Sequence, residues 1–171
     1  MQPVSLHIAM GLSIRRPKNP MHAALACISS PVIASPEVTI LLVDDQPAVR
    51  FGLQLLFELE PEPLHVWEAG SGAEAFALVE RVRPDVVIMD VDLPDHNGIT
   101  ATQHVKQLLP GCLVIMLTIH SGVEVRSRAL AAGAWAFVEK GKPEEMRATI
   151  HRAIQCIKGA PASSVLTTRQ S

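Results

Sequence analysis

The sequence predicts an α/β fold in which a five-stranded parallel sheet is doubly wound by helices. From Val38 onward, short aliphatic runs alternate with amphipathic stretches of helical periodicity, which is typical of repeated strand–helix units. The aliphatic runs are continuous rather than alternating, as expected of parallel strands that are covered on both faces. Hydrophobic residues make up 48% and charged residues 19% of the 171 residues, so the chain has enough apolar material for one compact core.

The first strand–helix unit begins with the aliphatic run Val38–Val43, for which we predict a central strand buried on both faces. Pro47 then suits the first turn of a helix, where the missing amide hydrogen is not needed. We expect this helix to end before Pro61. Its apolar stripe has helical spacing and consists of Val49, Leu53, Leu56 and Phe57.

Four further units follow, separated by Gly, Pro and polar residues. We predict strands at Leu64–Ala69, Val86–Met89, Leu113–Leu117 and Trp135–Val138, and helices at Gly72–Arg83, 99–109, Val123–Ala132 and Pro143–Ile157. To the inner face and flank of the second helix we assign Ala73, Phe76, Ala77, Val79 and Glu80, and to that of the last helix Met146, Ile150, Ala153, Ile154 and Ile157.

Connections between parallel strands are almost always right-handed, so these units predict a three-layer αβα arrangement with flavodoxin-like strand order. We expect a flexible N-terminal extension at residues 1–36, one folded domain at 37–158 and a short disordered tail at 159–171.

Polar residues follow several of the predicted strands at their carboxyl ends, which lie at one edge of a parallel sheet. They are Asp44 and Asp45 from the first strand, Asp90 from the third, Thr118 from the fourth and Lys140 from the fifth. Three close carboxylates repel one another unless a cation lies among them, and oxygen ligands favour a hard divalent ion such as Mg²⁺. Mg²⁺ leaves positions open for phosphate oxygens, so one carboxylate could attack a phosphoryl donor while the lysine and threonine hold the anion.

Several segments of the chain match a known family. They are Leu-Leu-Val-Asp-Asp-Gln at 41–46, Val-Val-Ile-Met-Asp-Val-Asp-Leu-Pro at 86–94 with Asn97-Gly98, Met-Leu-Thr at 116–118, and Gly133-Ala134 through Phe137 to Lys140. With these segments, the stretch from Leu41 to Ile157 resembles the receiver domain of bacterial two-component response regulators. Within that family it is most similar to receivers that usually precede a LuxR-type DNA-binding domain. Only a short polar tail follows Ile157, so we expect a stand-alone receiver.

The resemblance implies a role for each residue at the edge. Asp90 would accept the phosphoryl group, with Thr118 and Lys140 binding its oxygens. The Mg²⁺ ligands would be Asp45, Asp90 and the backbone carbonyl of Asp92, with Asp44 as a further acidic partner through water. Phe137 matches an aromatic position that turns inward on activation, together with Thr118. The implied partners are a sensor histidine kinase or a histidine phosphotransfer protein, a downstream protein effector and a second copy in a homodimer.

Two positions depart from the wider family. Gly141 follows Lys140 where a proline is common, so the geometry of that peptide bond is expected to differ. Ile119 places a branched side chain where many receivers have a small residue. We hypothesise that Ile119 restricts access of water and slows hydrolysis of the phosphoryl group.

Composition excludes several other classes of protein. Residues 1–36 carry Arg15, Arg16 and Lys18 with no acidic residue, which leaves a formal charge of −5 on the rest of a chain whose total is −2. An acidic body does not favour direct nucleic-acid binding. No apolar run is long enough to span a membrane, and three well-separated cysteines suit a reducing cytoplasm.

For other notable residues, we favour ordinary structural roles. We expect His104 and His120 to be solvated, Lys142 to lie in solvent, and Cys112 and Cys156 to be buried apolar residues. For Trp135, core packing and an interface role remain equally open.

Two alternative functions remain open. The first is a phosphorylation-independent, receiver-like interaction module. The second is a magnesium-dependent phosphohydrolase, because Asp90-Val91-Asp92 resembles the start of haloacid-dehalogenase-type enzymes, although Pro94 does not fit that pattern.

Overall fold

The computed structural model describes residues 37–119 and 122–159. Strands and helices alternate in the order β1 (Val38–Val43), α1 (Pro47–Phe57), β2 (Leu64–Ala69), α2 (Gly72–Val82), β3 (Val86–Asp90), α3 (Gly98–Leu108), β4 (Leu113–Thr118), α4 (Val123–Ala131), β5 (Ala136–Glu139) and α5 (Pro143–Gly159). All strand pairs are parallel and the sheet order is β2-β1-β3-β4-β5, which confirms the predicted flavodoxin-like topology. The predicted flexible extension at 1–36 and most of the predicted tail lie outside the described residues.

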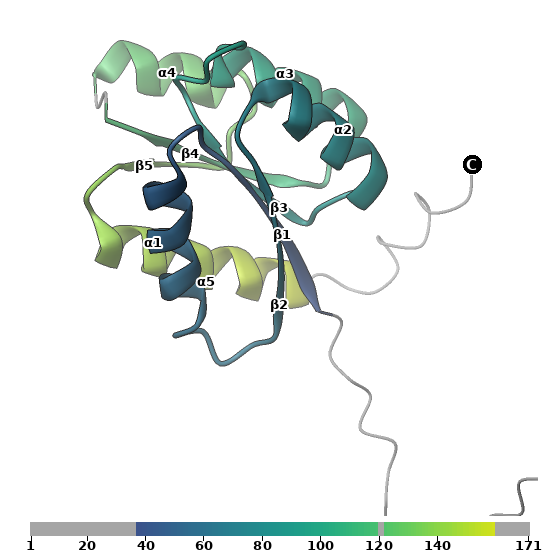
Figure 1. The fold of residues 1–171 in the computed structure, drawn as a ribbon, viewed down its shortest axis with the longest axis vertical. Coiled ribbons are helices and arrows are strands. Elements are labelled where there is room, and N and C mark those ends of the chain that lie inside the picture. The colour runs from purple at the N-terminus through teal and green to yellow at the C-terminus, as the bar shows by residue number, and fades with distance from the viewer. Residues whose placement is uncertain (1–36, 120–121, 160–171) are drawn as a thin grey trace, which may run out of the picture. The chain divides into compact units, whose positions relative to one another are not determined.

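Helices cover both faces of the sheet and produce three layers (Figure 1). α1 and α5 pack on one face, and α2, α3 and α4 on the other. β1 contributes to both cores, because successive side chains of a strand point to opposite faces. Ile40 and Leu42 pack with α1 and α5, whereas Leu41 and Val43 pack with the other three helices. β1 is therefore buried on both faces, as predicted.

The predicted element bounds are correct to within one or two residues. β3 and β4 include the polar residues Asp90 and Thr118 at their ends, and β5 is shifted by one residue to Ala136–Glu139. α5 continues to Gly159, two residues beyond its predicted end. Its predicted inner face is correct, because Met146, Ile150, Ala153 and Ile154 are buried and Ile157 packs against them.

The predicted inner face of α2 is wrong in part: Val79 is buried and Phe76 packs against the core, but Ala73, Ala77 and Glu80 do not lie there. Gly72, Ala75 and Val79 are the buried residues of this helix, whereas Ala73, Ala77 and Glu80 are exposed and Phe76 is only partly buried. Both sets have helical spacing, and alanine occurs in each. The sequence pattern of α2 therefore does not determine which stripe faces the sheet. The helix ends at Val82 because Arg83 adopts the left-handed conformation, with φ 51°.

Two of the structural assignments for single residues also need correction. Cys112 is buried as predicted, and burial raises the pKa of its thiol to about 12. Cys156 is exposed, because it lies on the face of α5 opposite the buried Ile154. His104 is half-buried rather than solvated, with its ring centroid 4.5 Å from that of Phe76.

Three further single-residue predictions concern Lys142, Trp135 and His120. Lys142 is exposed, as predicted, and its ammonium pairs with Glu139 at 2.8 Å. Trp135 is exposed to 36%, and the guanidinium carbon of Arg152 lies 5.9 Å from its ring centroid. His120 lies outside the described residues.

The loop between β3 and α3 is closed by backbone contacts. The amide of Gly98 donates to Val91 O at 2.8 Å, and Asp92 and Asn97 form an antiparallel bridge. The Asn97 side chain caps α3 by accepting from Ile99 N at 2.9 Å. A Cβ atom at position 98 would lie 1.8 Å from the carbonyl oxygen of Asp90, so this loop requires glycine there.

We predict that Gly98→Ala lowers the free energy of unfolding by at least about 3 kcal/mol, because the added methyl group meets backbone that cannot move aside cheaply. Urea denaturation followed by circular dichroism measures this. Gly52→Ala is the matched control: Gly52 lies within α1, and apart from that helix no heavy atom of the described residues lies within 4 Å of the added Cβ. We expect this control to gain about 0.5–1 kcal/mol. Similar changes in the two variants would contradict the close approach of Gly98 to Asp90.

Candidate functional site

Three aspartates meet at the carboxyl edge of the sheet. Asp44 and Asp45 follow β1, and Asp90 ends β3, which is the direct neighbour of β1 in the sheet. One carboxylate oxygen from each residue lies within 4.8 Å of the others. Asp44 is 1% and Asp90 3% exposed, whereas Asp45 is exposed. Parallel pairing of β1 and β3 thus brings together carboxylates that are more than 40 residues apart in the sequence.

Lys140 connects this cluster to β5. Its ammonium nitrogen lies 2.7 Å from Asp90 Oδ2 and 2.7 Å from Asp44 Oδ2. Burial lowers the pKa of Lys140, but the contacts with Asp44 and Asp90 outweigh this effect and raise the pKa overall. Lys140 therefore stays a cation between the two buried carboxylates.

Burial dominates the titration of Asp90. It raises the pKa of the carboxyl group above its ordinary value, and the hydrogen bond and charge of Lys140 oppose that rise only in part. The negative charge of Asp44 raises the pKa further. Additional positive charge near Asp90 would therefore stabilise the ionised form of its carboxyl group.

Thr118 and Asp92 lie beside the cluster. Thr118 is fully buried at the end of β4, and its carbonyl accepts a hydrogen bond from Lys140 N at 2.7 Å. The amide of Asp92 lies 3.4 Å from Asp90 Oδ1, and its side chain is exposed. A hollow of about 410 Å³ reaches this part of the edge and is lined by the β3–α3 loop and Asp45. Asp45 and Asp92 therefore face a hollow that is open to solvent.

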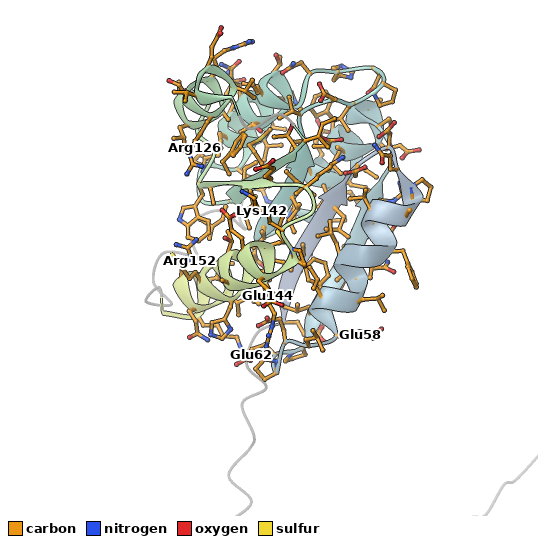
Figure 2. The ribbon with its side chains drawn as sticks, turned by 90° about the vertical axis from the view of Figure 1, so that its left-hand side faces the viewer. Glu58, Glu62, Arg126, Lys142, Glu144 and Arg152 are labelled. Carbon is orange, nitrogen blue, oxygen red and sulfur yellow. The ribbon has the colours of Figure 1, made fainter. Side chains whose placement is uncertain are left out.

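Phe137 is buried beneath α4, 5% exposed. The guanidinium carbon of Arg126, on α4, lies 5.5 Å from its ring centroid, within the range of a cation–π contact. Figure 2 labels Arg126 together with Lys142 and Arg152, all three on the side of the molecule formed by α4, the β5–α5 turn and α5. The ring of Phe137 is thus buried in the described structure.

The residues of the edge fit a divalent metal ion. Three carboxylates and one ammonium carry a formal charge of −2, which a divalent cation would neutralise. Asp44 Oδ2 is buried and makes no hydrogen bond of acceptable geometry, although Lys140 lies close to it. Carboxylate oxygens are the ligands that Mg²⁺ prefers. The donor set, the charge and the buried oxygen without a hydrogen bond all agree with Mg²⁺.

Sequence reasoning missed Arg50 and Asp95, which also shape this edge. Arg50 Nη1 donates to the backbone carbonyl of Asp44 at 2.7 Å. Asp95, in the β3–α3 loop, accepts from the amides of Gly72 at 2.8 Å and Ala73 at 2.9 Å, so it caps α2 from outside that helix. The usual capping signal is local in sequence, and Asp95 lies more than 20 residues from the helix that it caps.

We predict that Asp95→Asn destabilises the protein at neutral pH more than in acid. The hydrogen bonds from Ala73 N and Gly72 N lower the pKa of Asp95 from 3.8 to about 2. A depressed pKa in the folded state stabilises the protein fully above the unfolded pKa, and this contribution disappears as pH falls from 3.8 to about 2. Urea unfolding of both proteins at about pH 7 and about pH 3 tests this. A difference in stability that does not change with pH would argue against the capping role.

The fold and the edge define a class of protein, the response regulator receiver domain. The model of that family matches residues 40–151, and the chain belongs to it. It is thus a receiver domain of a two-component system. Within the described residues, no helix is long and apolar enough to cross a membrane.

Individual relatives support the same family. The DNA-binding transcriptional activator DevR/DosR of Mycobacterium tuberculosis is 43% identical over 103 residues, which cover 60% of this chain and 48% of the relative. The transcriptional activator protein ExaE of Pseudomonas putida is 42% identical over 101 residues, or 59% and 47% of the two chains. The chain thus spans about half the length of these curated relatives.

Solved structures agree with the fold. A LuxR-family two-component response regulator from Aurantimonas sp. SI85-9A1 aligns with a TM-score of 0.63 at 36% identity, covering 72% of this chain and 86% of that one. A CheY-like response regulator receiver domain protein from Methanospirillum hungatei JF-1 aligns with a TM-score of 0.65 at 27% identity, covering 72% and 99%. The sheet order and the helices described above are those of a receiver domain.

Proposed function

We propose that this receiver accepts a phosphoryl group on Asp90 in the presence of Mg²⁺. The observation that carries the proposal is the position of Asp90: its buried carboxylate lies 2.7 Å from the Lys140 ammonium and shares the edge with Asp44 and Asp45. The negative charges of Asp44 and Asp45 destabilise an isolated carboxylate anion on Asp90. The same charges favour binding of a cation, and that cation would also attract phosphate oxygens.

In the proposed reaction, an Asp90 carboxylate oxygen attacks the phosphorus of a phosphohistidine on a partner protein. A new O–P bond forms while the P–N bond breaks, and its electron pair leaves with the histidine nitrogen. Lys140 remains protonated and pairs with the phosphoryl oxygens, and the Thr118 hydroxyl donates to them. When bound, Mg²⁺ supplies further neutralisation of the phosphoryl charge, held by Asp45, Asp90 and the backbone carbonyl of Asp92, with Asp44 through water.

The proposed output is a change in protein contacts. A phosphoryl group on Asp90 adds charge and acceptor oxygens, and we infer that it draws Thr118 and Lys140 toward it. Lys140 follows β5, and Phe137 lies within that strand beneath α4. The phosphoryl group would therefore bias the surface formed by α4, β5 and α5, where Phe137 serves as the switch residue.

For partners, we propose a sensor histidine kinase or a histidine phosphotransfer protein upstream, and a protein effector or a second copy of the chain downstream. We place the protein in the cytoplasm, where such kinases present their phosphohistidine. The names of several relatives describe DNA binding or transcription by longer chains, and we propose no nucleic-acid contact for the receiver itself. That the receiver acts alone, without an output domain, stays a prediction.

We predict that incubation with acetyl phosphate and Mg²⁺ adds one phosphoryl group to the protein, as measured by intact-mass spectrometry. Asp90→Asn should abolish the adduct because the nucleophile is lost. Asp92→Asn is the matched control, since we assign only its backbone carbonyl to the site, and it should still be labelled.

The alternatives lead to other outcomes of that experiment. No adduct on the wild-type protein would favour a phosphorylation-independent interaction module. Rapid turnover of an unrelated phosphomonoester would favour the phosphohydrolase, against which the family membership already argues.

We predict that the phosphorylated protein loses its phosphoryl group over minutes or longer, and that Ile119→Ala makes the loss several times faster. Ile119 follows Thr118 directly and is 64% exposed. We propose that its branched side chain covers the phosphoryl group from the solvent side and slows attack by water. Release of inorganic phosphate from the purified phospho-form measures the rate. A wild-type half-life of seconds, or equal rates for the two proteins, would contradict this role.

A further inference from the structure

Arg50 joins the acidic edge to the neighbouring strand. It lies in α1, is 17% exposed, and its Nη1 donates to the backbone carbonyl of Asp44 at 2.7 Å. Its Nε donates to Glu68 Oε2 in β2 at 2.6 Å. One guanidinium group therefore bonds to the turn that carries Asp44 and Asp45 and to the strand beside it.

Glu68 is itself held in place. The side-chain amide of Gln54, one turn after Arg50 in α1, donates to the second carboxylate oxygen of Glu68. Gly70, which follows β2, also lies near the guanidinium, since a Cβ there would lie 3.8 Å from Arg50 Nη1. Glu68, which Gln54 holds in turn, therefore fixes the guanidinium in the orientation in which it reaches the carbonyl of Asp44.

The backbone and one carboxylate oxygen of Asp44 are fixed by hydrogen bonds. Its amide donates to Ala69 O at 3.1 Å, its carbonyl accepts from Arg50, and its Oδ1 accepts from Gln46 N at 2.9 Å. Within the described residues, Oδ2 alone of its polar atoms makes no hydrogen bond of acceptable geometry, and this oxygen lies 2.7 Å from the Lys140 ammonium. The hydrogen bonds to the other atoms and the Lys140 ion pair together orient the Asp44 carboxylate, and Arg50 supplies the bond to its backbone carbonyl.

We propose that Arg50 is a positioning residue for the cation of this site, and that Glu68 holds Arg50 in the orientation that this requires. The proposal rests on the proposed function, because it assigns Arg50 to the Mg²⁺ site inferred there. Arg50 bonds to the backbone of Asp44 and does not itself coordinate the ion. Groups that orient metal ligands in this indirect way typically alter metal affinity by about 10- to 100-fold.

Lysine cannot replace Arg50 in this role. The planar guanidinium presents several donors in a fixed arrangement, so one side chain reaches Glu68 and the Asp44 carbonyl together. A lysine ammonium retains the charge but is a single flexible donor group. Arg50→Lys therefore separates the effect of geometry from that of charge.

The test is a Mg²⁺ titration of the wild-type protein, Arg50→Met and Arg50→Lys, followed by amide NMR shifts of the β1–α1 turn. We expect both variants to bind Mg²⁺ at least about 10-fold more weakly. The Mg²⁺ concentration for half-maximal labelling by acetyl phosphate should rise by the same factor. The maximal rate at saturating Mg²⁺ should stay close to that of the wild type, because Asp90 and Lys140 are unchanged.

Arg81→Met is the matched control. Arg81 lies in α2 with its guanidinium carbon 5.4 Å from the ring centroid of Trp67, so the same side chain is lost without touching the β1–α1 turn. Its Mg²⁺ affinity should equal that of the wild type. Thermal unfolding in EDTA measures stability for every variant, so a loss of affinity can be compared with any loss of folding.

A second pair of variants tests Glu68. Glu68→Gln should weaken Mg²⁺ binding by itself but add nothing to Arg50→Met, because both act through the same contact. It also keeps the proposal testable if Arg50→Met fails to fold. Additive losses would overturn the part assigned to Glu68.

The outcomes distinguish a failure of the Arg50 proposal from a failure of the proposed phosphoryl transfer to Asp90. If the wild type binds Mg²⁺ and is labelled but the Arg50 variants keep its affinity, Arg50 is only a structural residue and this inference is overturned. A lowered unfolding temperature with unchanged affinity overturns it in the same way. If the wild type neither binds Mg²⁺ nor accepts a phosphoryl group, the proposed function fails and this inference fails with it.

Discussion

The site depends on the ion pair between the buried Asp90 carboxylate and the Lys140 ammonium. Carboxylates whose oxygens lie within 4.8 Å of one another repel with an energy on the order of 3 kcal/mol per pair or more at an effective dielectric constant near 20. The Lys140 ammonium pairs with the carboxylates of Asp44 and Asp90 and offsets the repulsion between them. One ammonium among three carboxylates still leaves an excess of negative charge, and this imbalance would favour a cation at the edge.

The parallel sheet makes this arrangement rigid. β3 lies between β1 and β4, and β5 pairs with β4, so the residues of the site follow adjacent strands. Their backbone positions are fixed by the sheet hydrogen bonds, and the two cores below and above the sheet hold it in place. The ion pair between Lys140 and Asp90, 50 residues apart, is therefore formed without a dedicated loop.

Much of the fold and of the acidic edge could be predicted from the sequence, because both depend on simple local patterns. Continuous aliphatic runs indicate buried parallel strands, and the polar residues that follow several of these runs indicate the carboxyl edge, as for Asp90 and Lys140. The inner face of α2 could not be predicted, since alanine lies on both candidate stripes and only packing against the sheet selects Ala75 over Ala77. Cys156 was assigned to the core by residue type alone, although the periodicity of α5 places it outside.

Arg50 and Asp95 were missed for a different reason. Asp95 acts on the backbone of α2, more than 20 residues earlier in the sequence, and Arg50 reaches the nearby Asp44 carbonyl only in the orientation that Glu68 holds. A single arginine or a loop aspartate gives no periodic signal. Glu68 and Arg50 are 18 residues apart and meet only because α1 packs beside β2. Contacts of this kind depend on tertiary geometry, so a single sequence cannot reveal them.

The segment from Asp92 to Asn97 is anchored along its whole length. The bridge between its two ends closes it, Gly98 fits against Asp90 without spare volume, and Asp95 attaches it to α2. Because this loop is held at both ends and in the middle, an inserted residue would disrupt at least one of these contacts. Changes in chain length are accommodated more easily between Glu58 and Pro63, which join α1 to β2 on the opposite edge, than in this loop beside the acidic residues.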